Sequence, residues 1–252
     1  MIYFIGAGPG DPELLTIKGK RLIDEADTVV YAGSLVNPEV LAGCGPGTEI
    51  RNSAEMDLDE VIEVMSAAHA AGKKVVRVHT GDPAVYGAIR EQMDRLDDLG
   101  IVYEVVPGVS SVFACAAALK KEFTLPGVSQ TVILTRMEGR TPVPDEEGIA
   151  ALARHRATMA IFLSVGMIDD VVAQLIAGGY PPETPAAVVH KASWPDQKEV
   201  VGDLRDIGRK VAAAGISKTA IILVGGFLGD VYELSKLYDP AFTTEYRQGR
   251  PA

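Results

Sequence analysis

A chain of 252 residues is long enough for one large α/β domain or two smaller ones, and with 47% apolar and 23% charged residues it can bury a substantial core. The formal net charge of -10 excludes broad nucleic-acid binding, which needs a cationic surface. A local group of Arg or Lys side chains can still bind an anionic small molecule within such a field.

Cysteine content and hydropathy narrow the class further. Cys44 and Cys115 lie far apart in the sequence and show no metal-binding spacing. They predict neither a disulfide framework nor a zinc site, and they favour a reducing cytoplasm. No basic leader precedes the first apolar run, and no stretch approaches the roughly 20 apolar residues of a membrane span. We therefore expect a soluble cytoplasmic protein without a metal site or membrane attachment.

Short apolar runs alternate with helical patterns in the first half of the chain. Thr16 is the expected N-cap of the first helix, and Asp57 or Asp59 that of the second. The repeated β-α order predicts a mostly parallel sheet covered by helices. The strands are expected at 1–7, 27–33, 73–83 and 101–108, and the helices at 16–26, 57–72, 84–100 and 109–120.

Periodicity is lost at 120–130, which contains Pro126 and Gly127 and marks a domain boundary. Helical patterns are less regular beyond it, so a mixed sheet is expected there. The predicted organisation is an α/β domain at 1–120, a second α/β domain at 128–238, and a tail at 239–252. Strands of the second domain are expected at 131–136, 157–165, 186–192, 197–203 and 218–226, and helices near 146–155, 167–178 and 204–214.

A first glycine-rich loop, residues 6–12, follows the first predicted strand. A dinucleotide fingerprint requires G-x-G-x-x-G, but here the third glycine comes one residue early. Pro9 and Pro12 remove two backbone donors, and Asp11 places a negative charge where a phosphate would bind. Phosphate binding is therefore disfavoured. The alternative is a plain strand-to-helix connector that uses glycine for tight turns.

Two further loops follow strands in the same way. We name residues 79–87 the second loop and residues 107–111 the third loop. The carboxyl edge of a parallel sheet is where open α/β proteins bind ligands, and all three loops are expected there. None of them contains Lys or Arg. Carboxylates, hydroxyls and backbone groups suit a neutral or positively charged ligand, and S-adenosylmethionine (SAM) has a sulfonium and an ammonium but no phosphate.

The motifs "GAGPGDPELLT", "TGDPAVYG" and "VPGVSS", in this order, resemble those of the tetrapyrrole methylase family, SAM-dependent enzymes that methylate corrinoid and sirohaem precursors. The resemblance covers roughly residues 1–235. Within the family, "YAGSLV", "TRMEGRTPVP" and "ASWPDQ" resemble members that methylate ring carbon 11 of precorrin-4 or cobalt-precorrin-4 in cobalamin biosynthesis.

The resemblance implies two α/β domains, a cofactor bound in the cleft between them, a small-molecule tetrapyrrole substrate and a homodimer. It also implies that SAM is converted to S-adenosylhomocysteine (SAH). Many relatives have glycine at the position of Thr80, so that contact can differ here. The implied cofactor-binding residues are Pro9, Thr80, Gly81, Asp82, Val85, Ser110, Ser111, Ser164, Ala187, Thr219 and Ala220.

The substrate carries several carboxylates, which must meet cations. Arg136, Arg140 and Lys191 are the candidates, although a solvated surface position is commoner for an exposed arginine. Trp194 either stacks on the macrocycle or packs at a domain or dimer interface. Asp11 is the candidate catalytic group facing the substrate, and its alternative role is an Asx-type turn that stabilises the loop.

Three other functions remain open on the sequence. A methyltransferase of the same fold can act on another tetrapyrrole position, in uroporphyrinogen or another precorrin. A non-catalytic tetrapyrrole- or nucleotide-binding module would not need the intact set of cofactor loops. A nicotinamide-dependent oxidoreductase is disfavoured by the composition of the first loop.

Overall fold

The computed structural model describes residues 1–250, which fall into two compact units. The first contains Met1–Ala118 and Lys191–Lys198, and the second contains Leu119–His190 and the residues from Glu199 onward. The segment Lys191–Lys198 thus belongs to the first unit although it connects two strands of the second. The tail expected at 239–252 extends two positions beyond the described residues.

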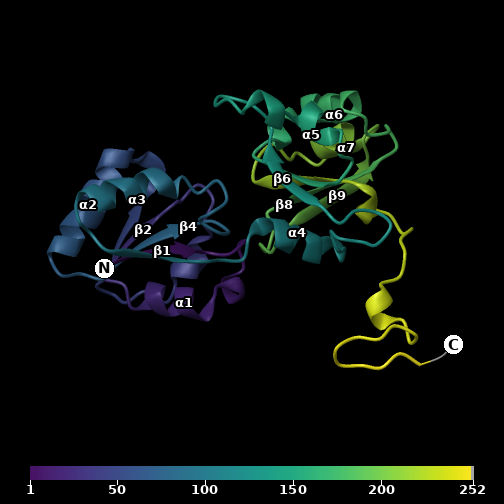
Figure 1. Ribbon diagram of the computed structural model, residues 1–252. Helices are drawn as coiled ribbons and strands as arrows, with labels where there is room; N and C mark the ends of the chain where they lie inside the picture. Colours follow the sequence, from purple (N-terminus) through teal and green to yellow (C-terminus); the bar gives the residue numbers. More distant parts are fainter. Residues whose placement is uncertain (251–252) are drawn as a thin grey trace. The chain divides into compact units, whose positions relative to one another are not determined.

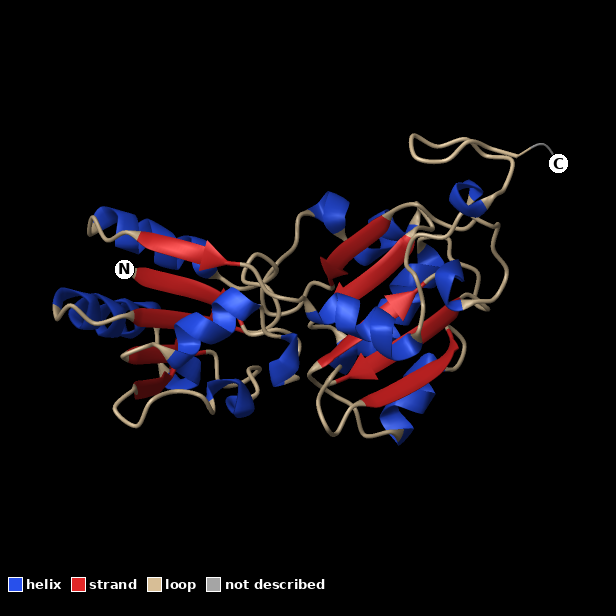
Figure 2. Ribbon diagram, turned by 90° about the horizontal axis from the view of Figure 1, so that it is seen from below, coloured by secondary structure: helices blue, strands red, loops and turns tan. Residues whose placement is uncertain are grey.

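The first sheet is parallel in every recorded strand pair, as expected, with the strand order β3-β2-β4-β1-β5. Figure 2 shows its strands side by side in red. β3 was not expected, because its sequence EIRN is mostly polar and the strand is mostly exposed at the sheet edge. The strands are β1 (Ile2–Gly6), β2 (Thr28–Tyr31), β3 (Glu49–Asn52), β4 (Val75–His79) and β5 (Tyr103–Val106).

Helix caps of the first unit follow the sequence. α1 (Ile17–Asp24) begins after Thr16, whose side chain accepts a hydrogen bond from the Gly19 amide. α2 (Leu58–Ala70) begins after Asp57, which forms a reciprocal capping box with Glu60, so Asp57 and not Asp59 is the N-cap. α4 (Ser111–Leu119) follows the third loop directly.

The helix expected at 84–100 is much shorter than predicted. α3 covers only Ile89–Asp98. Tyr86 and Ala88 have left-handed backbone conformations, with φ of 56° and 49°, which an α-helix cannot contain. The preceding residues therefore extend the second loop.

Alternate residues of the first sheet build two apolar layers. Ile5, Val29 and Val76 face α1, whereas Phe4 and Val30 face α2 and α3. Figure 1 shows α1 on one side of this sheet and α2 and α3 on the other. Because both faces are covered, the carboxyl edge of the strands remains the place where the connecting loops gather.

The second unit contains a mixed sheet, which confirms the expectation. Its strand order is β6-β7-β10-β8-β9. β6 and β7 are parallel, while β10 is antiparallel to both β7 and β8. The strands are β6 (Val132–Arg136), β7 (Thr158–Phe162), β8 (Pro185–His190), β9 (Lys198–Asp203) and β10 (Ala220–Val224).

Three helices cover one face of this sheet: α5 (Ile149–Ala153), α6 (Ile168–Ala177) and α7 (Ile207–Ala213). Their apolar side chains pack against Met159, Val188 and Ile222. None of the helices within residues 1–250 is both long and apolar enough to span a bilayer. The short 3-10 helices are η1 (Pro12–Leu14), η2 (Pro38–Leu41), η3 (Ser53–Glu55), η4 (Asp145–Glu147), η5 (Val165–Met167), η6 (Gly226–Leu228) and η7 (Lys236–Tyr238).

Candidate functional site

The three loops of the first unit meet at one sheet edge. β1 lies between β4 and β5, and all three strands run parallel, so the first, second and third loops leave the sheet side by side. Gly6 at the end of β1 pairs with His79 at the end of β4. The placement predicted from the β-α order is confirmed.

Backbone hydrogen bonds join the first loop to the second. The Ala7 amide donates to the His79 carbonyl at 2.7 Å. Gly8 and Gly81 then exchange two bonds: the Gly81 amide donates at 2.8 Å and the Gly8 amide at 3.3 Å. The two loops therefore form a short antiparallel bridge.

Glycine is required where the loops approach most closely. A Cβ atom on Gly6 would lie 2.6 Å from both the Gly108 Cα and the Gly81 carbonyl oxygen. A Cβ on Gly108 would lie 2.7 Å from the Gly6 Cα. These backbones touch without side chains between them, so the glycines set the spacing of all three loops.

Both carboxylates of the loops make bonds that organise the backbone. The two oxygens of Asp82 accept from the Ala84 amide at 2.8 Å and from the Gly108 amide at 2.9 Å, which ties the second loop to the third. Asp11 caps η1 by accepting from the Glu13 amide at 2.8 Å. This is the Asx-type turn considered for Asp11.

The other predicted residues of these loops lie close to the junction. Thr80 and Val85 are half-buried in the second loop, and Ser110 is buried in the third. Gly81 has a φ of 60° and lies beside the backbone of Ser110 and Ser111. The structure therefore brings together Pro9, Thr80, Gly81, Asp82, Ser110 and Ser111.

Residues 191–197, which we name the strap, hold the first loop from outside it. The Trp194 indole Nε1–H donates to the Pro9 carbonyl at 2.9 Å, and the Asp11 amide donates to Ser193 Oγ at 3.0 Å. A Cβ on Gly10 would lie within 2.8 Å of Trp194 Cγ and closer still to two other ring atoms. Sequence reasoning did not find this contact, because no local pattern links positions about 185 residues apart.

The strap places two predicted substrate-binding residues together. Lys191 Nζ lies 5.0 Å from the centroid of the Trp194 ring and 2.6 Å from an Asp196 carboxylate oxygen. Lys191 and Ser193 have positive φ angles of 48° and 69°. The Ser193 amide donates to Gln197 Oε1 at 2.6 Å, which stabilises this tight turn.

In the second unit, Ser164 and Thr219–Ala220 lie at neighbouring strand ends. Ser164 follows β7, and Ala220 begins β10, which pairs with β7 in antiparallel register. Ser164 is fully buried: its hydroxyl donates to the Phe162 carbonyl at 2.7 Å and accepts from the Met137 amide at 2.9 Å. Its neighbour Leu163, which the sequence did not single out, is 63% exposed with a φ of 54°.

Ala187 lies inside β8, opposite Leu223 of β10, and is fully buried. Arg136 and Arg140 belong to the segment after β6. The Arg136 guanidinium donates to the Thr141 and Pro142 carbonyls at 3.2 and 2.7 Å. Arg140 is exposed and has no hydrogen-bonding or ion-pair partner among residues 1–250.

Left-handed backbone conformations concentrate in the predicted site segments. The structure has eight non-glycine residues with positive φ among those described, and six of them lie in or directly beside these segments: Tyr86, Ala88, Leu163, Lys191, Ser193 and Thr219. Such conformations cost free energy and persist where surrounding contacts impose them, as happens at ligand sites.

Two buried basic residues lie behind the second loop. Arg77 donates to Gln92 Oε1 at 3.0 Å and to the Val30 carbonyl at 3.3 Å. Burial lowers the pKa of Arg77 to about 10. Burial and the Arg77 charge lower the pKa of His79 to about 3, so His79 is neutral at physiological pH. Its ring stacks on Phe4, with centroids 6.0 Å apart.

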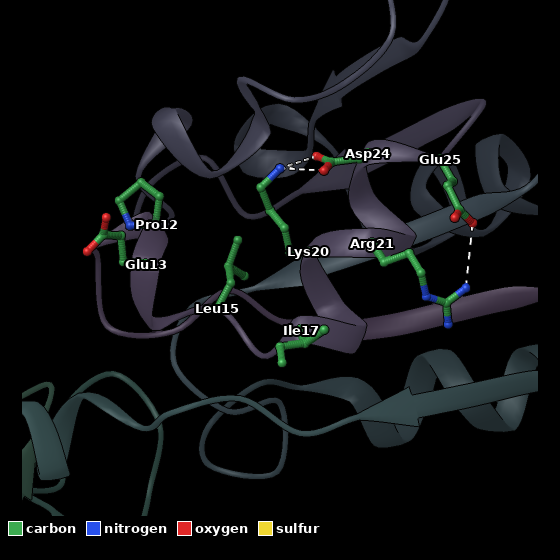
Figure 3. Close-up of a pocket in the computed structure, with 8 residues that line it drawn as sticks. All are labelled: Pro12, Glu13, Leu15, Ile17, Lys20, Arg21, Asp24 and Glu25. Carbon is green, nitrogen blue, oxygen red and sulfur yellow. Dashed lines mark hydrogen bonds and ion pairs between the residues drawn. The ribbon is translucent and has the colours of Figure 1, made fainter.

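An open hollow of about 750 Å³ lies beside α1 (Figure 3). Its cations are already paired: Lys20 with Asp24, and Arg21 with Glu25. None of the predicted site residues lines it, so we do not assign the hollow to the cofactor or the substrate. The lining residues are Pro12, Glu13, Leu15, Ile17, Lys20, Arg21, Asp24 and Glu25.

A parallel sheet with three cation-free loops at its carboxyl edge, together with a second unit built on a mixed sheet, defines a two-unit α/β protein of the small-ligand-binding kind. The chain matches the tetrapyrrole (corrin/porphyrin) methylases over residues 1–208, and it belongs to this family. The family resemblance found in the sequence is confirmed.

Individual relatives agree with this assignment. The chain is 59% identical over 248 residues to the cobalt-precorrin-4 C(11)-methyltransferase of Methanocaldococcus jannaschii, covering 98% of this chain and 96% of the relative. A solved cobalt-precorrin-4 methyltransferase has 49% identity and a TM-score of 0.89, covering 91% and 96%. The uroporphyrin-III C-methyltransferase of Thermus thermophilus, solved with S-adenosylhomocysteine, has 30% identity and a TM-score of 0.74, covering 90% and 98%.

Proposed function

We propose that this protein is a SAM-dependent methyltransferase that adds a methyl group to carbon 11 of precorrin-4 or cobalt-precorrin-4. The similarity to the Methanocaldococcus jannaschii enzyme, 59% over nearly the full length of both chains, carries this proposal. The structure of the Thermus thermophilus relative, which was solved with S-adenosylhomocysteine, supports SAM as the cofactor.

The chemistry of the loops fits SAM. Gly6, Gly81 and Gly108 bring three backbones together, and the loops present amides, carbonyls, hydroxyls and carboxylates without a single cation. Such a set suits a positively charged ligand that has ribose and adenine hydrogen-bonding groups and no phosphate. We propose that the loop residues already named bind the cofactor, with Ser164, Ala187, Thr219 and Ala220 contributing from the second unit.

Bound SAM supplies an electrophilic methyl group on a positively charged sulfur, which a nucleophilic ring carbon of the substrate takes up. The protein's own contribution is alignment and the exclusion of water, because the electrophile needs no further activation. The glycine contacts and the Asp82 bonds fix the loops to one another, which supports this role. Asp11 is proposed to face the substrate with the carboxylate oxygen that does not cap η1.

Tetrapyrrole carboxylates need cations. Arg140 is the most available, because its guanidinium is exposed and uncommitted among the described residues. The Lys191 ammonium pairs with Asp196 and would have to bind substrate beside it. The Arg136 guanidinium uses some of its N–H groups to bond the loop after β6, and the remaining N–H groups are proposed to bind the substrate. We also propose a homodimer, as the family resemblance implies.

Calorimetric titration with SAH, with NAD as control, tests the cofactor assignment first. We expect micromolar binding of SAH, on the order of -8 kcal/mol, and no binding of NAD. Turnover is then assayed by mass spectrometry with precorrin-4, cobalt-precorrin-4 and uroporphyrinogen III. Addition of one methyl group to either precorrin-4 form supports the proposal. Binding of NAD, or methylation of uroporphyrinogen alone, would overturn it.

A further inference from the structure

We propose that Trp194 is a positioning residue for the first loop: its indole N–H fixes the Pro9 carbonyl and thereby holds the loop in its cofactor-binding conformation. This inference rests on the proposed function. It assigns to Trp194 a role in SAM binding, instead of the stacking on the tetrapyrrole considered from the sequence.

The middle of the first loop is held by side chains from elsewhere in the chain. The Pro9 carbonyl accepts from Trp194 at 2.9 Å, the Gly10 carbonyl from Asn37 Nδ2 at 2.8 Å, and the Asp11 amide donates to Ser193 at 3.0 Å. Three consecutive residues thus depend on partners far away in the sequence.

The second and third loops are built differently. Asp82 ties them together with two bonds to backbone amides, and Gly81 pairs with Gly8 through the backbone. Removing the indole N–H therefore leaves the junction of the loops intact and releases only the Pro9 carbonyl, while Asn37 and Ser193 still hold Gly10 and Asp11. A loss of cofactor affinity without a loss of folding is the consequence we expect.

The strap presents the indole in a fixed orientation. The Trp194 amide donates to the Lys191 carbonyl at 3.0 Å, the Gln197 amide donates to the Trp194 carbonyl at 3.1 Å, and Gln197 Oε1 accepts from the Ser193 amide. Lys191 Nζ lies over the indole ring, 5.0 Å from its centroid. This ammonium occupies a place over the ring that a macrocycle stacked on the same face would need.

The edge of the Trp194 ring also packs against Gly10. The ring atoms Cδ1 and Nε1 lie where a Cβ of residue 10 would stand, so the indole packs directly on the glycine backbone. Trp194 therefore both donates a hydrogen bond to the loop and sets its position by packing.

The test uses Trp194→Phe, which keeps an aromatic ring and removes the N–H. We expect the Kd for SAH and the KM for SAM to rise about tenfold, the effect of losing one hydrogen bond and the contact it directs. The KM for the tetrapyrrole and the kcat at saturating SAM should stay near their wild-type values. Ser193→Ala, which removes the second bond of the strap, should raise the same two constants about fivefold.

Tyr103→Phe is the matched control, because it removes one hydrogen bond, to Asp97, from the same unit and away from the loops. It should leave the Kd for SAH unchanged. Trp194 is the only tryptophan, so its emission reports on the strap alone. We expect SAH to change this emission in the wild-type protein and in Tyr103→Phe.

The outcomes separate this inference from the proposed function. If the wild-type protein does not bind SAH, the proposed function fails. If it binds SAH and Trp194→Phe and Ser193→Ala bind equally well, only the positioning role is overturned. A raised KM for the tetrapyrrole with an unchanged Kd for SAH would also overturn it, in favour of stacking on the substrate.

Discussion

Replacing His79 tests whether a buried neutral histidine makes the first unit sensitive to acid. His79 ends β4, is 4% exposed, and its Nε2 has no hydrogen-bonding partner within residues 1–250. Its pKa falls from the ordinary value of 6.5 to about 3, first because of burial and then because of the nearby Arg77 charge. The substitution is His79→Leu, which puts an apolar side chain of similar size, without a titratable group, in the same place.

The sign and size of the effect follow from proton linkage. Between pH 6.5 and 3 the unfolded chain binds a proton at His79 and the folded chain does not, so the stability that depends on neutral His79 is lost as the pH falls through this range. At about pH 5.0, which is about 1.5 pH units below the ordinary histidine pKa, the free energy of unfolding has fallen by about 2 kcal/mol on account of His79. Carboxylates remain mostly ionised at that pH, so they contribute little.

Urea unfolding at about pH 7.5 and pH 5.0, followed by circular dichroism, measures the difference. The wild-type free energy of unfolding should fall by about 2 kcal/mol more than that of His79→Leu over this interval. His155→Gln, at an exposed position of the second unit, is the control and should behave as wild type. Equal pH dependence in His79→Leu and wild type would refute the argument that His79 is kept neutral by burial.

Three further substitutions test contacts within the first unit. Gly10→Ala should cost about 2 kcal/mol in urea unfolding, because its Cβ would collide with the Trp194 ring and because side chains rarely adopt the Gly10 φ of 157°. The part of the cost that the collision causes should disappear in a Trp194→Ala background, and equal costs in both backgrounds would show that the ring does not set the position. Asp57→Ala should lower the free energy of unfolding in urea by about 1 kcal/mol, because it removes the capping box. An unchanged free energy of unfolding would contradict the assignment of Asp57 as the N-cap. Arg77→Met should lower the free energy of unfolding by about 2 kcal/mol, because it leaves Gln92 Oε1 buried without its donor. Adding Gln92→Leu should recover part of that loss, and a double variant less stable than Arg77→Met alone would contradict the explanation.

Much of the fold could be predicted because its elements carry local signals. The strands β1, β2, β4 and β5 of the first sheet are mostly apolar runs, as a sheet covered on both faces requires. Two elements lacked such a signal. β3 is a short exposed edge strand, and the start of α3 depends on the left-handed conformations of Tyr86 and Ala88, which composition does not reveal.

The site was predictable to the extent that chain topology dictates it. Parallel strands bring their carboxyl ends together, so the meeting of the three loops follows from the β-α order alone. The strap does not follow, because Ser193 and Trp194 reach the first loop through tertiary contacts only. Asn37 was missed for the same reason, and Leu163 because composition does not reveal its left-handed backbone conformation. The family motif "ASWPDQ" did mark the strap as a segment of interest.

The features that disfavour phosphate in the first loop also explain why it needs the strap. Pro9 has no amide hydrogen, and neither has Pro12, so the loop has fewer donors with which to satisfy its own carbonyls. The carbonyls of residues 9 and 10 are instead satisfied by the Trp194 indole and the Asn37 amide. A loop of this composition is poorly suited to wrap a phosphate with its own amides, and donors from outside the loop bond two of its carbonyls. The proposed phosphate-free cofactor and the proposed positioning role of Trp194 therefore rest on the same feature of the sequence, a loop with few amide donors of its own.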